Sequence, residues 1–188
     1  MSTLDTPQMN NVSPRPTGIR YGFIAALISI ALGLVASTAG LIDYTQQNSA
    51  GNWIISLLNY AIIIGALVMG MKKHREDLGG YMTFGQGFMV GLWATLIMAV
   101  ITLVWTYINF SFIEPDAIST MMEASRDQMI DRGMNDEQID QAMQFTGWMM
   151  NPTMLSVFGA VGSLIGGLII SLIVAAIMQR KPPVDAAV

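Results

Sequence analysis

Four long stretches of this chain contain no Asp, Glu, Lys, Arg or His. The first two are about as long as the ~20 apolar residues that an α-helix needs to cross a hydrocarbon core of ~30 Å, and the last two are longer. The sequence therefore predicts an all-α polytopic membrane protein with the lipid bilayer as its surroundings. The four predicted transmembrane helices are residues 21–42, 53–71, 84–112 and 152–178.

The first stretch has a second interpretation, as the apolar core of a cleaved signal peptide. Ser37, Thr38 and Ala39 form a small-residue sequence that loosely resembles a cleavage site. Cleavage there would leave three spans and an external N-terminus. The apolar stretch is longer than a usual signal core, so we expect it to be retained as a span.

The Lys and Arg residues between the spans predict the orientation of the chain. Two lie in the N-terminal tail, three in the second loop and two after the fourth span, whereas the first loop has none. Cytoplasmic loops carry an excess of Lys and Arg, so both termini are expected in the cytoplasm. Residues 1–20 and 182–188 then form cytoplasmic tails, the first of them predicted to be disordered because it is rich in proline.

The segment 113–151, between the third and fourth spans, is predicted to lie outside the membrane. It holds eight of the chain's 13 acidic residues and only two arginines. Apolar residues recur at near-helical spacing before Gly133, and Asn135 followed by Gln138 predicts the start of a second helix. The segment is therefore expected to form an acidic, extracytoplasmic helical hairpin.

Sequence signals also mark the starts of the last two spans. Thr83 and Gln86 fit a T-x-x-Q capping box before the third span. Asn151 and Pro152 precede and begin the fourth, because Asn is a good N-cap and Pro is tolerated at the first helical position.

Small residues four apart predict close contacts between helices, because they let another backbone approach. Each span has one such row, which predicts a single bundle, although any row could equally serve a contact between two chains. The rows are Ser29, Gly33 and Ser37; Ala61 and Gly65; Gly87 and Gly91; and Gly162 and Gly166.

Catalytic, cofactor and metal sites find little support in this sequence. There is no cysteine, so disulfides and thiolate chemistry are excluded, and HExxH, GxSxG and Walker motifs are absent. The single histidine, His74, lies at a cationic helix end. Sixteen methionines suggest Cu(I) as an alternative, but packing of an amphipathic hairpin explains them better.

The eight acidic residues of the hairpin lack the spacing of a calcium-binding loop, and we interpret them as a solvated helix face. No basic patch is present for nucleic acid to bind. We therefore predict no catalytic residue, no cofactor and no metal site.

The stretch KKHREDLGGYMTFGQGFMVGLWATLIMAVITLVWTYINFSFIEPD at 72–116 resembles the membrane family catalogued as domain of unknown function 4199. The element GG-x-x-[ST]-FGQ-x-F at 79–88 is the most specific part of the likeness, which continues through EQIDQAM at 137–143 and SLIVAAIMQRK at 171–181. The resemblance implies a small four-span protein of a bacterial inner membrane, and it implies no catalytic residue.

From these patterns we expect a non-enzymatic interaction or accessory protein of the bacterial inner membrane that binds itself or another membrane protein. The alternative is a small transporter or channel component that acts as an oligomer. Its path would be lined by Asn59, Gln86, Thr95 and Thr102.

Overall fold

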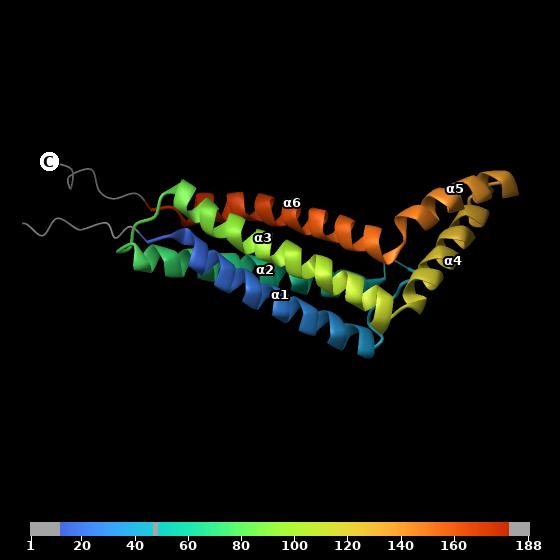
Figure 1. The fold of residues 1–188 in the computed structure, drawn as a ribbon, viewed down its shortest axis with the longest axis horizontal. Helices are drawn as coiled ribbons and strands as arrows, with labels where there is room; N and C mark the ends of the chain where they lie inside the picture. The colour runs from blue at the N-terminus through green and yellow to red at the C-terminus, as the bar shows by residue number, and fades with distance from the viewer. Residues whose placement is uncertain (1–11, 47–48, 181–188) are drawn as a thin grey trace, which may run out of the picture. The chain divides into compact units, whose positions relative to one another are not determined.

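The computed structural model describes residues 12–46 and 49–180, and in these ranges the chain is helical apart from its connecting loops. An isolated pair of backbone hydrogen bonds joins Met82 to Arg180, and no strand occurs in the described ranges. In chain order the elements are α1 (Pro14–Thr38), α2 (Ala50–Asp77), α3 (Phe84–Ile108), the π-helix η1 (Asn109–Ile113), α4 (Asp116–Asp131), α5 (Asp136–Met149) and α6 (Pro152–Met178) (Figure 1).

The long helices α1, α2, α3 with η1, and α6 are the 4 candidate membrane spans among the described residues. Their outward faces carry large apolar side chains, and Val35, Leu57 and Ile177 are 64%, 63% and 76% exposed. Exposed apolar surface costs roughly 25 cal/mol per Å² in water, so hydrocarbon is the solvent that suits these faces. The predicted all-α, four-span fold is confirmed, with α4 and α5 between the third and fourth spans.

Helix α1 begins at Pro14, before the expected start at Tyr21. The prediction of a disordered tail is therefore wrong for residues 14–20. Proline content is a poor indicator of disorder here, because the first N–H groups of any helix have no partner within it, so Pro14 and Pro16 fit the first turn. Ser13 Oγ accepts a hydrogen bond from the Arg15 N–H at 3.4 Å. The rest of both predicted tails lies outside the described residues.

The other end of α1 also differs from its predicted position. The helix stops at Thr38, not at Ile42, and Gly40 follows with a φ of 67°. The Leu41 N–H donates to the Ala36 carbonyl at 2.9 Å, which closes the last turn around the left-handed glycine. Helix α2 continues past the predicted end at Met71 as far as Asp77.

The helices pack as two compact units, and the first comprises the described parts of Met1–Leu27, Ala61–Met98 and Ser163–Val188. Met82 and Arg180 exchange backbone hydrogen bonds of 2.9 and 2.8 Å in this unit, which ties the loop before α3 to the end of α6. Its buried core comes from α2, the loop before α3, α3 and α6: Leu67, Met71, Leu78, Met82, Val90, Ala94, Val174 and Ala175.

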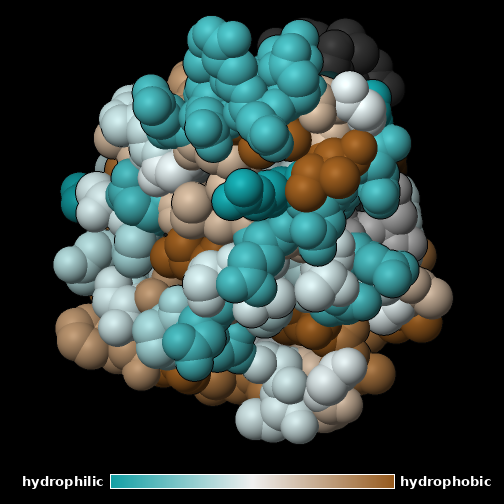
Figure 2. Space-filling view, turned by 90° about the vertical axis from the view of Figure 1, so that its right-hand side faces the viewer, coloured by the Kyte–Doolittle hydropathy of each residue, from teal (hydrophilic) through white to brown (hydrophobic). Residues whose placement is uncertain are grey.

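The second unit comprises Ile28–Tyr60 and Ala99–Gly162 and includes the hairpin of α4 and α5. The two helices contact each other, and α4 also contacts η1. Gly133, with a φ of 76°, makes the turn between them, and Ile139 is buried with 3% of its surface exposed. Figure 2 shows the face that carries this hairpin, where hydrophilic residues predominate and a few apolar residues lie among them.

Candidate functional site

A half-buried carboxylate, Glu114, stands where the third span ends. The chain leaves α3 through η1, and the Glu114 N–H donates to the Asn109 carbonyl at 2.8 Å, a wide turn that precedes Pro115. Single π-turns of this kind are frequent at functional positions. The Glu114 carboxylate accepts hydrogen bonds from the hydroxyls of Ser37 and Tyr44. One side chain thus connects the end of α1, the loop after it and the start of the hairpin.

Tyr44 is held by this carboxylate and by an aromatic neighbour. Its ring meets Phe110 edge to face, with the ring centroids 6.5 Å apart and the planes at 67°. Burial, and next the hydrogen bond and charge of Glu114, raise the pKa of the Tyr44 hydroxyl above its ordinary value. The phenol therefore stays protonated and keeps donating to Glu114 through the neutral pH range.

The loop around Tyr44 is fixed by a turn built on Asp43. Its carboxylate accepts hydrogen bonds from the Thr45 hydroxyl at 2.6 Å and from the N–H groups of Thr45 and Gln46 at 2.8 and 3.1 Å. The Thr45 hydroxyl, followed by these two N–H groups, lowers the pKa of Asp43. Asn52, in the first turn of α2, forms two hydrogen bonds with the backbone of Asp43. Its Oδ1 accepts from the Asp43 N–H at 3.1 Å, and its Nδ2 donates to the Asp43 carbonyl at 2.8 Å.

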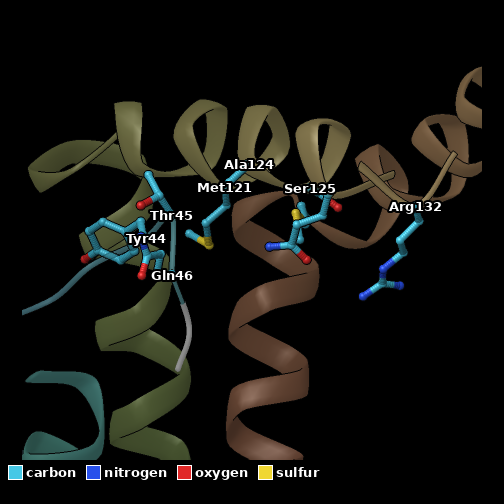
Figure 3. Close-up of a pocket in the computed structure, with 9 residues that line it drawn as sticks. Tyr44, Thr45, Gln46, Met121, Ala124, Ser125 and Arg132 are labelled. Atoms are coloured by element: carbon cyan, nitrogen blue, oxygen red, sulfur yellow. The ribbon is translucent and has the colours of Figure 1, made fainter. Parts of the chain in front are cut away.

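Between this loop and the hairpin lies a cavity of about 480 Å³, which we call the hairpin pocket. In Figure 3, Tyr44, Thr45 and Gln46 lie at one end, Met121 and Ser125 of α4 lie in the middle, and Arg132 stands at the other end. The complete lining is Tyr44, Thr45, Gln46, Met121, Ala124, Ser125, Gln128, Arg132 and Met150.

The charge of this lining is positive, although the hairpin as a whole is acidic. Arg132 is its one charged residue, and the guanidinium makes no ion pair among the described residues, where the single salt bridge joins Lys73 to Asp77. Glu114 does not line the pocket, because its oxygens face the two hydroxyls that bond it. The pocket therefore offers a free guanidinium together with amide and hydroxyl groups.

A second cavity of about 260 Å³ adjoins the hairpin pocket and shares Tyr44 and Met121 with it. We call it the α2 slot, because Asn52, Ile55 and Ser56 of α2 form one side of it. Its complete lining is Ile42, Asp43, Tyr44, Asn52, Ile55, Ser56 and Met121.

Neither the carboxylate nor the two cavities were identified from the sequence. Glu114 was counted among the solvated acids of the hairpin, whereas its partners lie 77 and 70 residues earlier in the chain. Its position as the first acidic residue after the third span was the available signal. Such a residue lies at the membrane surface, where a carboxylate is costly to desolvate without donors.

The predicted small-residue rows occupy varied surroundings. A Cβ at Gly91 would lie 1.7 Å from Ser171 Oγ, and one at Gly87 would lie 3.4 Å from the Ala175 Cβ, so these two glycines face α6 closely. Ser29 donates to Asn59 at 2.7 Å, and Ser37 donates to Glu114. Ala61 is exposed, and a Cβ would meet nothing within 4 Å at the remaining members of the rows, Gly33, Gly65, Gly162 and Gly166.

Other glycines, absent from the predicted rows, also make close approaches in the first unit, two of them to backbone atoms. A Cβ at Gly18 would lie 2.5 Å from the Val90 carbonyl oxygen, and one at Gly22 would lie 2.4 Å from that of Ala94. A Cβ at Gly167 would lie 2.5 Å from Thr95 Cγ2. Gly18 and Gly22 are four apart, but Gly18 fell within the segment that was predicted to be a disordered tail.

Three of the four predicted capping residues form local hydrogen bonds at helix starts, and the fourth, Pro152, is the first residue of α6. Thr83 N–H donates to Gln86 Oε1 at 2.9 Å, and Gln86 N–H donates to Thr83 Oγ1 at 3.3 Å, as in a capping box. Helix α6 begins at Pro152, and Asn151 Oδ1 accepts from the Met154 N–H at 3.0 Å.

His74 lies in the last turn of α2 beside Arg75, at the predicted cationic helix end. Its side chain is fully buried, and neither ring nitrogen finds a partner among the described residues. The imidazole is therefore unavailable to a substrate in solution.

Comparison with known proteins identifies the family of the chain and nothing more specific. No curated protein and no solved structure matches it. The model of one family, described as a protein of unknown function, matches residues 20–180, which are most of the chain. The chain is thus a multi-pass membrane protein that belongs to the DUF4199 family.

Proposed function

We propose that this protein is a non-enzymatic interaction or accessory protein of the bacterial inner membrane, and that α2 contacts the partner. The observation that carries the proposal is a pair of polar side chains, Asn59 and Tyr60, on an outward face of this span. Both are exposed, with Tyr60 at 55%. They lie about 9 to 11 Å along the helix from Trp53, within the apolar stretch.

The hydrogen-bonding groups of this pair are incompletely satisfied. Asn59 Oδ1 accepts from Ser29 at 2.7 Å, but the Asn59 NH₂ group has no acceptor among the described residues, and neither has the Tyr60 hydroxyl. Lipid tails offer no acceptor, and an unsatisfied polar group in hydrocarbon costs several kcal/mol. A hydrogen bond across to another helix, worth roughly 0.6 to 2 kcal/mol in membranes, would satisfy them.

Open glycines give the same proposal a second line of support. Gly33, Gly65, Gly162 and Gly166 leave space at their Cβ positions within this chain. Small residues of this kind permit close approach of a second backbone, so they remain candidates for contacts with another chain. The partner in this proposal is a second copy or another membrane protein.

The structure gives less support to the alternative, an oligomeric transporter or channel. Gln86 is engaged in capping, and Thr95 is fully buried and donates its hydroxyl to the Leu92 carbonyl at 3.1 Å. Two of the four groups nominated for a solute path are thus used locally. A catalytic role is also less supported, because the chain has no cysteine and its one histidine is buried.

The test is photo-crosslinking in native membranes, with benzoylphenylalanine in place of Tyr60 and mass spectrometry of the adducts. A matched probe at Phe23, an exposed aromatic residue of α1, reports capture by lipid alone. We expect a reproducible protein adduct at position 60, and we expect Asn59→Leu to remove it. If position 60 captures only lipid, as position 23 does, the proposed contact through α2 is wrong.

A further inference from the structure

A small cavity of about 150 Å³ lies between the start of α1 and the end of α2, and we call it the α1–α2 cavity. These two helix ends lie at the same end of the first unit (Figure 1). The helices meet closely beside the cavity, because a Cβ at Gly70 would lie 3.3 Å from the Cβ of Tyr21. The complete lining is Pro16, Thr17, Arg20, Tyr21, Lys73 and Asp77.

The lining of the α1–α2 cavity carries more positive than negative charge. It contains two basic residues, Arg20 and Lys73, and one carboxylate, Asp77. Asp77 accepts a hydrogen bond from Lys73 Nζ at 2.7 Å, so its charge is already offset within the lining. Arg20 is exposed and makes no ion pair among the described residues. The unpaired charge is thus a guanidinium, whose planar fork of donors matches the oxygens of a phosphate.

Further donors around the cavity come from both helices. The hydroxyls of Thr17 and Tyr21 form no hydrogen bond within the part of the chain that the structure describes. The ammonium of Lys73 has three N–H donors and uses one of them on Asp77. The cavity therefore offers an excess of donors over acceptors, which suits an anion with several oxygens.

The position of these residues in the chain specifies the depth of the cavity. Arg20 directly precedes the charge-free stretch 21–42, and Lys73 is the second residue after the charge-free stretch 53–71. Both helices are candidate membrane spans, and the cavity lies where their charge-free parts stop. That boundary between hydrocarbon and water is the level of the lipid headgroups.

Exposed apolar side chains continue from each basic residue toward the middle of the spans. Residues three or four apart lie on one face of a helix. On α1, Ile24 and Leu27 follow Arg20 by four and seven positions, and they are 40% and 49% exposed. On α2, Met69 precedes Lys73 by four positions and is 59% exposed. A ligand held at the cavity by its phosphate can therefore lay hydrocarbon chains along these faces.

We propose that the α1–α2 cavity binds the phosphate of an anionic membrane phospholipid, whose oxygens contact Arg20 and Lys73. Basic pockets between transmembrane helices at this depth are suited to anionic headgroups, because the hydrocarbon holds the acyl chains while the charges hold the phosphate. This site lies at the other end of α2 from the contact proposed at Asn59 and Tyr60, and neither proposal depends on the other.

The experiment uses the full chain in a mild detergent, with phosphatidylglycerol as the probe and native mass spectrometry as the readout. Arg20→Gln removes the unpaired guanidinium, and we expect it to weaken phosphatidylglycerol binding about five- to tenfold. Lys72→Gln is the matched control, because Lys72 is exposed next to Lys73 and does not line the cavity. It should bind like the unchanged protein. Equal losses in the two variants would show attraction by the basic helix end in general and would overturn the site.

A second variant should change binding in the opposite direction. Asp77→Asn removes the only carboxylate of the lining and releases Lys73, so we expect it to tighten phosphatidylglycerol binding about two- to fivefold. Damage to the fold cannot produce such a gain. Glu76→Gln is its control, because Glu76 is exposed beside Asp77 and lies outside the lining. Unchanged or weaker binding by Asp77→Asn would contradict the proposed position of the phosphate.

Soluble glycerol 3-phosphate separates a lipid from a free phosphate ester as the source of the anion. The proposal expects it to displace phosphatidylglycerol only at concentrations at least about a hundredfold higher, because it lacks the acyl chains. Displacement at comparable concentrations would show that the cavity takes a soluble phosphate ester, and the assignment to a lipid would fall.

Discussion

Tyr44 donates its phenolic hydrogen to the carboxylate of Glu114, which lies 70 residues further along the chain. The same carboxylate accepts from Ser37 at the end of α1. Hydrogen bonds to charged groups are stronger than those between neutral ones, and they are strongest where water is partly excluded. This pair therefore fixes the loop that forms one end of the hairpin pocket.

Replacing Tyr44 by phenylalanine should destabilise the fold. The change removes a hydrogen bond to a charged acceptor, so we expect the free energy of unfolding to fall by about 1.5 to 3 kcal/mol. Thermal unfolding in detergent measures the effect. Tyr107→Phe is the control, because Tyr107 is exposed and makes no side-chain hydrogen bond among the described residues. Equal midpoints for the two variants would contradict the role of Tyr44.

The raised pKa of Tyr44 predicts a loss of stability in alkali. The folded state holds the phenolic proton more tightly than the unfolded chain, whose tyrosine titrates near 10.0. The contribution of the Tyr44 proton to the free energy of unfolding is therefore complete below pH 10. It is lost as the pH rises through the higher pKa of Tyr44 in the folded state. Unfolding midpoints measured from pH 8 to 12 should fall more steeply for the unchanged protein than for Tyr44→Phe. Parallel profiles would exclude this linkage.

The lowered pKa of Asp43 predicts the opposite dependence in acid. The folded state favours the ionised carboxylate of Asp43. Its contribution to stability is therefore present above the ordinary pKa of 3.8 and is lost as the pH falls through the lower pKa of the folded state. Hydrogen exchange, corrected for intrinsic rates, should show the Thr45 and Gln46 amides losing protection in that range. Asp43→Asn keeps an acceptor oxygen without the titration, and its protection should not change with pH.

A glycine in contact with backbone should tolerate a methyl group far less than one facing open space. Gly22→Ala would place a Cβ 2.4 Å from the Ala94 carbonyl oxygen, so helix α1 must shift, at a cost of about 1 to 3 kcal/mol. Gly33→Ala is the control on the same helix, where nothing lies within 4 Å. Alanine is favoured over glycine in helices by up to about 1 kcal/mol, so the control should be neutral or stabilising. Thermal unfolding midpoints of the two variants measure the difference, and we expect a lower midpoint for Gly22→Ala than for Gly33→Ala.

The orientation of the chain can be tested because it contains no cysteine. A single cysteine replacing the exposed Glu137, in the hairpin, should react with an impermeant maleimide in intact spheroplasts. One replacing the exposed Glu76, at the end of α2, should react only after the membrane is opened. This pattern follows from the excess of Lys and Arg beside Glu76. The reverse pattern would place the hairpin in the cytoplasm.

The features that the sequence predicted well depend on neighbouring residues. Spans are recognised by an absence of charge over about twenty positions, and the hairpin by Gly133 and the Asn135 cap, which act within a few residues. The start of α1 was misplaced for a local reason too, since Pro14 and Pro16 are equally compatible with a loop and with a first helical turn.

The candidate site could not be predicted because it is made by contacts between distant segments. The partners of Glu114 come from the end of α1 and the following loop, and the hairpin pocket adds residues from α4 and from the end of α5. No periodicity or spacing in one segment carries that information. The close approach of Gly22 to Ala94 could not be predicted for the same reason, because a row of small residues in one helix does not indicate which other helix packs against it.

The division of the chain into two units has a consequence for its biosynthesis. Among the described residues, each unit combines early and late segments: the first includes parts of Met1–Leu27 and of Ser163–Val188, and the second includes parts of Ile28–Tyr60 and of Ala99–Gly162. Neither can complete its packing until the ribosome has delivered almost the whole chain. The earlier spans must therefore wait in the membrane with their glycine faces uncovered, and during that interval the nascent protein is exposed to insertion factors and membrane proteases.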